Sequence, residues 1–249
     1  MKIVCIIPAR MESSRFPGKP MFKINGIPMI ERVFRNVKKN LMLSEVLVAT
    51  CNKKIFDHVT FTGGTAVMTS KRHKRASDRC YEALLKIEKR NKTKYQIIVM
   101  VQGDEPMVYP DMINEAVKPM LRDGKIKIVN LMSKINNQKE FLDPNIIKVL
   151  CDKNSNAIYF SRSAIPFGKF DKKNKPKKQV CIIPFRRDFL IKYNNLKPTN
   201  LEKIESIDML RVLENGYNVK MIDTKYFSHA VDTKLDALKV SKLLKKAND

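Results

Sequence analysis

Three cationic side chains lie close together near the start of the chain: Arg10, Arg15 and Lys19. Residues 8–20, which contain them, also include two serines, one glycine and three prolines. Guanidinium forks and a lysine point charge suit the several oxygens of a polyphosphate, and small residues let the backbone approach a ligand closely. A solvated basic loop is the simpler alternative in a chain so rich in lysine and arginine. The mixture of cations, small residues and stiffening prolines instead predicts a triphosphate-binding loop.

Two apolar segments place this loop and a carboxylate at the same edge of a predicted sheet. Residues 3–7 and 97–101 are continuously apolar, as expected of strands covered on both faces. The second segment runs into Gln102-Gly103-Asp104-Glu105-Pro106. Open α/β sheets bind ligands at the carboxyl ends of their strands, and a carboxylate across from a phosphate loop suits a magnesium-nucleotide site. On its own, Asp104 would more simply be explained as a turn residue.

The motifs in these loops resemble those of a known enzyme family. Pro8-Ala9-Arg10, followed by Ser14-Arg15-Phe16-Pro17-Gly18-Lys19-Pro20, is similar to the start of the sugar nucleotidyltransferases, and most of all to that of the 3-deoxy-manno-octulosonate cytidylyltransferases. Residues 102–106 match the family's pentapeptide, and Val231-Asp232-Thr233 matches a segment before its last helix. The resemblance covers nearly the whole chain. A Walker-type loop, which needs Gly-Lys followed by Ser or Thr, does not occur in the sequence.

The resemblance implies roles for particular residues of this chain. Arg10, Arg15 and Lys19 would hold the phosphates and act in catalysis, and Asp104 and Asp232 would bind Mg²⁺. The residues implied in nucleotide binding are Pro8, Ala9, Arg10, Ser14, Arg15, Lys19, Ala76, Ser77, Gln102, Gly103 and Asp104. We expect Glu105 only to order its turn, and Thr233 to cap the last helix.

A second group of matching segments implies a site for an acidic sugar. Residues 143–149 and 159–162 resemble the family, which places Arg162 near the sugar carboxylate, where a guanidinium fork fits. Glu205, within another matching segment, would accept hydrogen bonds from sugar hydroxyls. Gln179 belongs to the same implied pocket.

Two segments depart from the family pattern. The family carries His-x-Ser-Gly-Thr-Asp/Glu-Arg where this chain has His73-Lys74-Arg75-Ala76-Ser77-Asp78-Arg79, beside the implied base site. It carries His-x-Gly-x-Tyr-x-Tyr/Phe-Arg where this chain has residues 179–186, so Gln179 and Ile183 replace a histidine and a tyrosine that would face the sugar. The loss of these polar groups predicts that a modified ulosonic acid is a better substrate than the unmodified octulosonate.

Composition and charge limit the other possibilities. The net charge of the 249-residue chain is +24, from 49 Lys and Arg against 25 Asp and Glu, which permits binding to nucleic acid. The dense tract at residues 172–178 lacks interleaved aromatic residues for base stacking, so we expect a solvated loop there and no specific nucleic-acid partner. Five scattered cysteines argue against a zinc site or a disulfide framework. Without a membrane-length apolar run or a leader, we expect a cytoplasmic protein and no membrane insertion.

Hydrophobic periodicity and turn residues predict an alternation of strands and helices. The predicted strands are residues 3–7, 45–50, 65–69, 95–101, 127–132, 146–151, 157–161, 180–185 and 219–223, and the predicted helices are 29–39, 77–89, 110–121, 202–214 and 233–246. Such alternation favours an α/β fold with a mostly parallel central sheet and helices on both faces. The resemblance specifies a Rossmann-like nucleotidyltransferase fold with a smaller sugar-binding and dimerisation lobe. We expect a single domain over residues 1–249.

The resemblance implies an enzyme that transfers CMP from CTP to the anomeric hydroxyl of 3-deoxy-manno-octulosonate or a related acidic 2-keto sugar. Pyrophosphate would be released, and the product would serve lipopolysaccharide or surface-polysaccharide synthesis. Family members are commonly homodimers, which implies a homodimer here. Two alternatives stay open: a nucleotidyltransferase for a different sugar, and a basic nucleic-acid or anionic-surface binder that uses the fold without catalysis.

Overall fold

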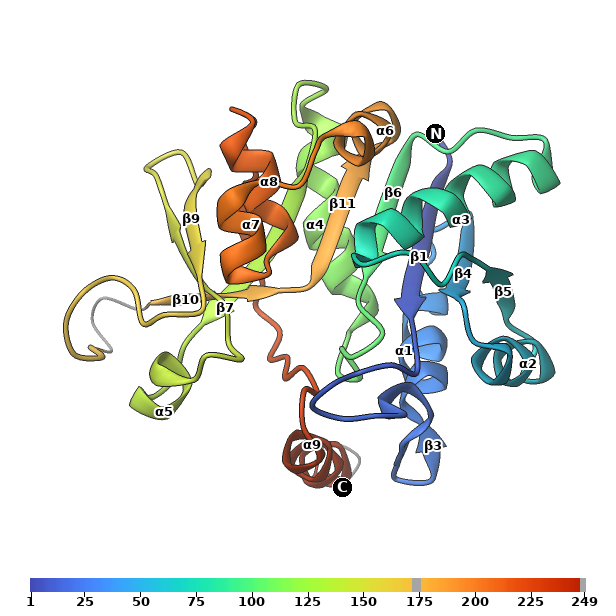
Figure 1. Ribbon diagram of the computed structural model, residues 1–249, viewed down its shortest axis with the longest axis horizontal. Coiled ribbons are helices and arrows are strands. Elements are labelled where there is room, and N and C mark those ends of the chain that lie inside the picture. Colours follow the sequence, from blue (N-terminus) through green and yellow to red (C-terminus); the bar gives the residue numbers. More distant parts are fainter. Residues whose placement is uncertain (172–175, 247–249) are drawn as a thin grey trace. The chain divides into compact units, whose positions relative to one another are not determined.

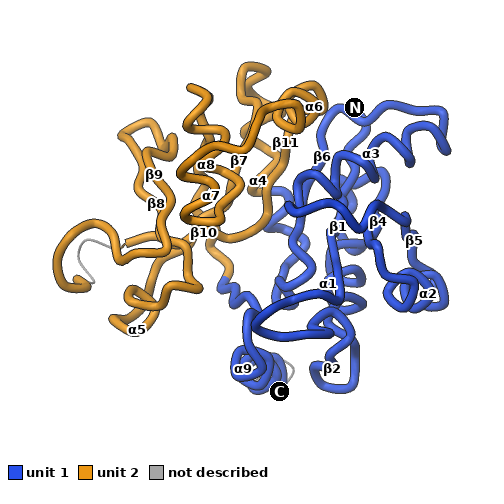
Figure 2. The backbone as a smooth tube through the Cα atoms, in the orientation of Figure 1, with its two compact units in different colours: residues 1–114, 227–249 blue, residues 115–226 orange. Residues whose placement is uncertain are grey.

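The computed structural model describes residues 1–171 and 176–246, and it divides into two compact units (Figures 1 and 2). Unit 1 combines residues 1–114 with 227–249, and unit 2 consists of residues 115–226. The chain therefore leaves the first unit, builds the second and then returns. The expectation of one domain over residues 1–249 is not tested by this division and stays a prediction.

Unit 1 contains parallel strands in the order β6-β1-β4-β5. Their bounds are Ile3–Ala9 for β1, Glu45–Thr50 for β4, Thr65–Met68 for β5 and Ile97–Val101 for β6. Every residue of β1 and β6 is buried, and Ile6 lies in register with both Leu47 and Met100. The apolar runs therefore form central strands, and the loops after β1 and β6 begin at the same edge of the sheet.

Helices cover both faces of these strands. In Figure 1, α3 (Ala76–Asn91) lies in front of them and α1 (Met29–Lys38) behind them. The buried residues of α1 include Met29, Val33 and Val37, which recur at helical spacing and form the face toward the sheet. Unit 1 also contains α2 (Lys53–Phe61), the short helix η1 (Lys19–Met21), the hairpin of β2 (Lys23–Ile24) and β3 (Ile27–Pro28), and α9 (Lys234–Lys246).

Unit 2 is built on a mixed sheet with the strand order β12-β7-β10-β8-β9. β12 pairs parallel with β7, and the remaining neighbours pair antiparallel. The strands are β7 (Val129–Lys134), β8 (Lys148–Cys151), β9 (Ala157–Ser161), β10 (Lys177–Val180) and β12 (Lys220–Asp223). Its other elements are α5 (Gln138–Leu142), β11 (Ile182–Arg186), α6 (Arg187–Asn195), α7 (Asn200–Glu205) and α8 (Asp208–Glu214). Helix α4 (Pro110–Arg122) spans the boundary between the units.

Two predicted elements prove to be interrupted. The strand predicted over residues 180–185 is two strands, because β10 ends at Val180 and β11 begins at Ile182. The helix predicted over residues 202–214 is also two, because Ser206 adopts a left-handed conformation with φ 57° and ends α7. One residue in that conformation breaks the helical hydrogen-bond ladder.

The prediction of a solvated loop at residues 172–178 is wrong at its carboxyl end. Residues 172–175 lie outside the described part of the chain, but Lys177 and Lys178 begin β10. Lys178 is buried, and its ammonium lies 3.4 Å from Glu140 Oε2, while Lys177 pairs with Asp223. A carboxylate supplied by a distant segment makes burial of the lysine tolerable.

None of the described helices is long and apolar enough to cross a membrane.

Candidate functional site

The predicted phosphate loop, within residues 8–20, is held by backbone contacts and by packing. Gly18 adopts φ 75°, and its N–H donates to Met11 O at 2.9 Å, which closes the loop before η1. Glycine suits this position because a side chain strains a left-handed backbone. The Phe16 and Phe22 rings contact edge-on, with centroids 5.2 Å apart. Phe16 belongs to a buried cluster with Ile24, Met29, Met107, Val231, Ala237 and Val240.

Lys19, at the start of η1, meets both of the carboxylates predicted to bind metal. Its Nζ lies 2.7 Å from Asp104 Oδ2 and 3.6 Å from Asp232 Oδ1, and it donates to Val231 O at 2.8 Å. Arg15 adds a second cation, with Nη2 2.8 Å from Asp232 Oδ1. The structure therefore brings the predicted phosphate-binding cations and the predicted metal ligands into one cluster.

The electrostatics of the cluster follow from burial and from like charges. Although burial disfavours the Lys19 ammonium, Asp104 and then Asp232 raise its pKa, so the lysine is charged at neutral pH. Burial raises the pKa of Asp232, and the neighbouring Asp104 carboxylate raises it further, against the effect of Lys19 and Arg15. The two acids thus share a site in which added positive charge is favourable.

The loop after β6 carries Asp104 into this cluster through a close backbone approach. A Cβ on Gly103 would lie 3.0 Å from Pro8 O and 3.3 Å from the Ile30 side chain, so a larger residue would push the loop away from β1. Asp104 O accepts a hydrogen bond from Val231 N at 2.9 Å, which ties in the carboxyl-terminal segment. Glu105 is buried and accepts from Ser228 Oγ at 2.7 Å, which joins this loop to the segment before α9; that Glu105 only orders its turn stays a prediction.

The start of α9 positions Asp232 and confirms the predicted cap. Asp236 N donates to Thr233 Oγ1 at 3.2 Å, and Thr233 N donates back to Asp236 Oδ2 at 2.8 Å. These reciprocal bonds satisfy donors that a helix start leaves unpaired. Although burial opposes ionisation, hydrogen bonds from His229 and Thr233 lower the pKa of Asp236. The carboxylate therefore holds the turn that presents Asp232.

The other predicted nucleotide residues lie at the same edge of the unit 1 sheet. Pro8 and Ala9 end β1, and the exposed Arg10 follows them; Arg10 donates no hydrogen bond within the described ranges, 1–171 and 176–246. Ser14 is exposed in the loop. Ala76 and the buried Ser77 form the first turn of α3, and Gln102 follows β6 half-buried. Arg75, at the N-cap of α3, offers no side-chain acceptor, so a cap that a serine could supply is missing there.

The predicted sugar residues all lie in unit 2, on its mixed sheet and beside it. The Glu205 carboxylate accepts from Ser161 Oγ at 2.7 Å and from Arg162 N at 2.8 Å. Arg162 donates from Nε to Glu205 O at 2.7 Å and from Nη1 to Pro144 O at 3.0 Å. Arg162 and Glu205 are thus joined to each other, while Gln179 lies on β10. The sugar-binding roles of these residues stay predictions.

Comparison with known proteins decides the family. A family model described as cytidylyltransferase matches residues 4–224. The chain belongs to the cytidylyltransferase family. It is 42% identical to the 3-deoxy-manno-octulosonate cytidylyltransferase of Geotalea uraniireducens (strain Rf4), over 99% of this chain and 100% of that protein. It is 40% identical to the protein of the same name from Fusobacterium nucleatum subsp. nucleatum, over 100% of this chain and 99% of that one.

Solved structures agree with this membership. The cytidylyltransferase matches a CMP:2-keto-3-deoxy-manno-octonic acid synthetase complexed with CTP, with a TM-score of 0.88 and 33% identity over 99% of this chain and 100% of that one. A 4-diphosphocytidyl-2C-methyl-D-erythritol synthase from Anaerococcus prevotii shares the fold, with a TM-score of 0.65 and 13% identity over 98% of each chain. The predicted nucleotidyltransferase fold and the predicted enzyme class are both confirmed.

Arg79 is a residue of the cytidylyltransferase to which the sequence analysis gave no role. Its side chain is only 3% exposed, and Nη1 donates to Thr69 Oγ1 at 2.5 Å and to Ser70 O at 3.4 Å. Within residues 1–171 and 176–246 it forms no ion pair with a carboxylate. Its charge acts on Glu12, whose pKa is lowered mainly by a hydrogen bond from Asn52 and also by Arg79. In the sequence, the one indication of a role for Arg79 was its place in residues 73–79, the segment that the resemblance puts beside the nucleotide base.

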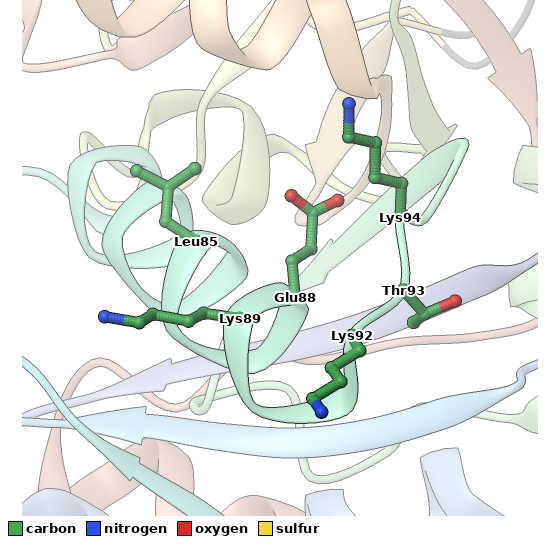
Figure 3. A pocket seen from close by; sticks show the side chains of 6 residues that line it. All are labelled: Leu85, Glu88, Lys89, Lys92, Thr93 and Lys94. Carbon is green, nitrogen blue, oxygen red and sulfur yellow. The ribbon is translucent and has the colours of Figure 1, made fainter.

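A hollow elsewhere in unit 1 does not compete with this site. It has a volume of about 390 Å³ and is lined by Leu85, Glu88, Lys89, Lys92, Thr93 and Lys94. Figure 3 shows that the three lysine side chains point in different directions, so their ammonium groups do not converge on one anion. Glu88 accepts from Tyr95 N at 3.1 Å, and Thr93 Oγ1 accepts from Lys2 Nζ at 2.7 Å. These groups order the turn after α3.

The carboxylates of the cytidylyltransferase fit a magnesium ion. Asp104 and Asp232 supply anionic oxygens, the ligands that Mg²⁺ prefers, and both lie within 3.6 Å of one cationic nitrogen, Lys19 Nζ. The raised pKa of Asp232 reflects the charge of Asp104 beside it, in addition to burial. In the described part of the chain, three or more His, Cys, Asp or Glu side chains nowhere gather as a ligand set. Water and substrate phosphates would complete the coordination, as is usual for Mg²⁺.

Proposed function

We propose that this cytidylyltransferase transfers CMP from CTP to the anomeric hydroxyl of 3-deoxy-manno-octulosonate or a closely related acidic 2-keto sugar. The observation that carries the proposal is the cluster in which Lys19 lies 2.7 Å from Asp104 and 3.6 Å from Asp232. It combines a cation for departing phosphates with two acids for a metal, at the carboxyl edge of a parallel sheet. The relatives named above, at about 40% identity over their full length, support the choice of sugar.

The reaction is an in-line displacement at the α-phosphorus. The anomeric oxygen forms a bond to that phosphorus, and the bond from the phosphorus to the oxygen that bridges to the β-phosphate breaks. The electron pair of the broken bond leaves with pyrophosphate, and the hydroxyl proton passes to solvent. The enzyme performs no covalent step in this scheme, so its residues act by positioning and by charge.

Three cations of the phosphate loop would neutralise the charge that develops on pyrophosphate. Lys19 is held in place by its contacts with Asp104 and Val231 O, and it stays protonated because its pKa is raised despite burial. Arg15 is held by Asp232. Arg10 is exposed, and its guanidinium makes no hydrogen bond within the described ranges, so it can bind phosphate oxygens directly.

Magnesium would be held by Asp104 and Asp232. When bound, it would polarise the α-phosphate and offset negative charge. The role of this chain's own residues is to supply the two anionic oxygens and to hold them at a fixed separation. Asp232 is fixed by the α9 cap, and Asp104 is fixed by its backbone bond to Val231. Replacement of either carboxylate is expected to weaken magnesium binding.

The cellular setting is part of the proposal. The scattered cysteines favour a reducing compartment, which supports a cytoplasmic enzyme, and an activated acidic sugar supports a role in lipopolysaccharide or surface-polysaccharide synthesis. The resemblance to family members that form dimers supports a homodimer. Light scattering coupled to size-exclusion chromatography tests this, because a mass near twice 28.8 kDa is expected.

A pyrophosphate-release assay tests the activity. The purified protein is supplied with Mg²⁺, with CTP, UTP, ATP or GTP, and with 3-deoxy-manno-octulosonate, other ulosonic acids or neutral sugars. We expect release with CTP and an ulosonic acid, at a kcat/KM of about 10⁴ M⁻¹s⁻¹ or more. A preference for another nucleotide or for a sugar without a carboxylate would refute the proposal.

A further inference from the structure

The segment that leads into α9, residues 228–233, is anchored on the rest of unit 1 (Figure 1). Ser228 and Val231 are both buried, and each forms a hydrogen bond to the loop after β6. His229 lies buried between these two anchors, and the proposed reaction gives it no part. A buried histidine this close to a proposed metal ligand calls for a role.

The His229 ring contacts the carboxylate of Asp236, in the first turn of α9. Its Nε2 lies 3.2 Å from Asp236 Oδ1, and the residue is only 9% exposed. Because an ionised carboxylate only accepts hydrogen bonds, Nε2 must carry a proton and donate it. From residues 1–171 and 176–246, Oδ1 of Asp236 accepts no other hydrogen bond. The histidine thus occupies one oxygen of this carboxylate and leaves the second for other donors.

The second oxygen of Asp236 holds the turn that carries the proposed metal ligand. Asp236 Oδ2 accepts from Asp232 N at 3.2 Å, from Thr233 N at 2.8 Å and from Thr233 Oγ1 at 2.7 Å. The terminal torsion of an aspartate side chain has no sharply preferred value. A hydrogen bond to Oδ1 therefore limits rotation of the carboxylate and keeps Oδ2 toward the turn.

The turn, in its place, determines where the side chain of Asp232 points. Asp232 Oδ1 lies 2.8 Å from Arg15 Nη2 and 3.6 Å from Lys19 Nζ, while its backbone N–H is bonded to Asp236. Mg²⁺ demands a nearly ideal octahedral geometry with short bonds to oxygen, so it tolerates little displacement of a ligand. A shift of this turn would therefore weaken metal binding even with both acids present.

From these contacts we propose that His229 is a positioning residue for magnesium binding, which acts through Asp236 to hold the turn that directs the Asp232 carboxylate to the metal. The inference rests on the proposed function and deepens it. Groups that orient a metal ligand commonly change metal affinity by about 10- to 100-fold when they are replaced. Since His229 acts through a further residue, we expect a loss at the lower end of that range.

The experiment measures the dissociation constant for CTP by calorimetry, without a sugar, once in excess Mg²⁺ and once in EDTA. The ratio of the two constants reports the contribution of the metal, and damage to the nucleotide site as a whole changes both constants alike. In His229→Leu we expect the constant in Mg²⁺ to rise about tenfold and the constant in EDTA to stay at its wild-type value.

Two amide variants test the reach of the donor. In His229→Gln the amide nitrogen is four bonds from Cα, as Nε2 of histidine is, so the ratio should return toward that of wild type. In His229→Asn the nitrogen is only three bonds from Cα and matches Nδ1, so the loss should remain. A general need for a polar side chain at this position would treat the two amides alike.

A histidine elsewhere in unit 1 supplies a matched control. His58 Nε2 lies 2.8 Å from Glu31 Oε2, in a pair between α2 and α1, and His58→Leu should leave the ratio unchanged. A double substitution tests the route of the effect. Once Asp236→Ala is present, His229→Leu should add no further loss, because the effects of residues that act through one another are not additive.

The possible outcomes separate this inference from the proposed function. A wild-type ratio in His229→Leu, or an equal loss in His229→Gln and His229→Asn, would overturn the inference and leave the proposed function intact. If His229→Leu does not fold, the comparison of the two amides decides. A ratio unchanged by Asp232→Asn would refute the proposed metal site, and this inference with it.

Discussion

Replacement of Lys19 by alanine tests the centre of the proposed mechanism. The substitution removes an ammonium whose side chain is 12% exposed and which contacts Asp104, Asp232 and Val231 O. The flanking Gly18 turn and the aromatic contact of Phe16 with Phe22 involve no atoms of the lysine side chain beyond Cβ. The loop should therefore keep its course while its buried charge is lost.

The expected cost to catalysis is large, and the cost to stability is small. Loss of one preorganised charged contact to a developing anion is worth about 3 kcal/mol, or more than a hundredfold in kcat. The carboxylates that lose their partner are 24% and 21% exposed, for Asp104 and Asp232. Because water reaches both, we expect the free energy of unfolding to fall by no more than about 1–2 kcal/mol, less than for a fully buried pair.

Steady-state pyrophosphate release and calorimetry measure these effects, with Lys23→Ala as the control, since Lys23 is an exposed cation on the neighbouring strand β2. Without CTP, the Lys19→Ala protein should bind Mg²⁺ more tightly than wild type, because the ammonium no longer competes for the two carboxylates. Turnover should nevertheless collapse. Near-wild-type kcat in a folded Lys19→Ala protein would remove the lysine from the mechanism, and unchanged Mg²⁺ binding would show that the ammonium and the metal use different oxygens.

Three further predictions concern metal, pH and charge. Asp104→Asn and Asp232→Asn should each raise the Mg²⁺ concentration for half-maximal rate, since each removes an anionic ligand; a titration that superimposes on wild type would assign that carboxylate a structural role. Although burial opposes it, hydrogen bonds from Lys86, Ser70 N and His73 lower the pKa of Glu82 from 4.5 to about 2. Its ionised form therefore stabilises the fold above pH 4.5, and this stabilisation is lost as the pH falls toward 2. Urea unfolding should show Glu82→Gln less stable than wild type at pH 7 and the two converging near pH 2.5, and a constant difference would contradict the assignment. Binding to duplex DNA should be weak, independent of sequence and lost steeply with salt; sequence-selective binding at about 0.15 M salt would show that the +24 charge has a nucleic-acid partner.

Strands buried on both faces were predictable because their residues carry the signal themselves. The predicted strand of residues 3–7 lies within β1, and the apolar run of residues 97–101 is β6, and every residue of these two strands is buried. Helix α2 was missed because its buried residues include only Ile55 and Val59, and Phe61 at its end is 90% exposed. Such a helix is stabilised by its contacts with β4 and β5, and a short window of sequence does not reveal them.

In the site, too, some features were evident from the sequence and others only from the fold. The residue types of the phosphate loop and the acids were evident from motif and resemblance, but their pairing was not. Lys19 lies 85 residues from Asp104 in sequence, and nothing local indicates that its ammonium holds both acids. Local charge density was misleading at Lys178, which is buried against Glu140. In each case the deciding partner comes from a distant part of the chain, which only the fold brings near.

The return of the chain to unit 1 has a consequence for the order in which the enzyme acquires its activity during translation. The phosphate loop is synthesised first, but Asp232 and the residues Val231, Ala237 and Val240 that pack against Phe16 come from the segment after residue 226. At ribosomal rates of about 5–20 residues per second, synthesis from residue 114 to residue 232 takes on the order of ten seconds. During that interval Lys19 and Asp104 can meet without their third partner. A nascent chain, or one cleaved ahead of Phe227, would therefore contain the nucleotide motifs but lack the second acid, so only chains that have completed unit 1 from both ends would turn over CTP.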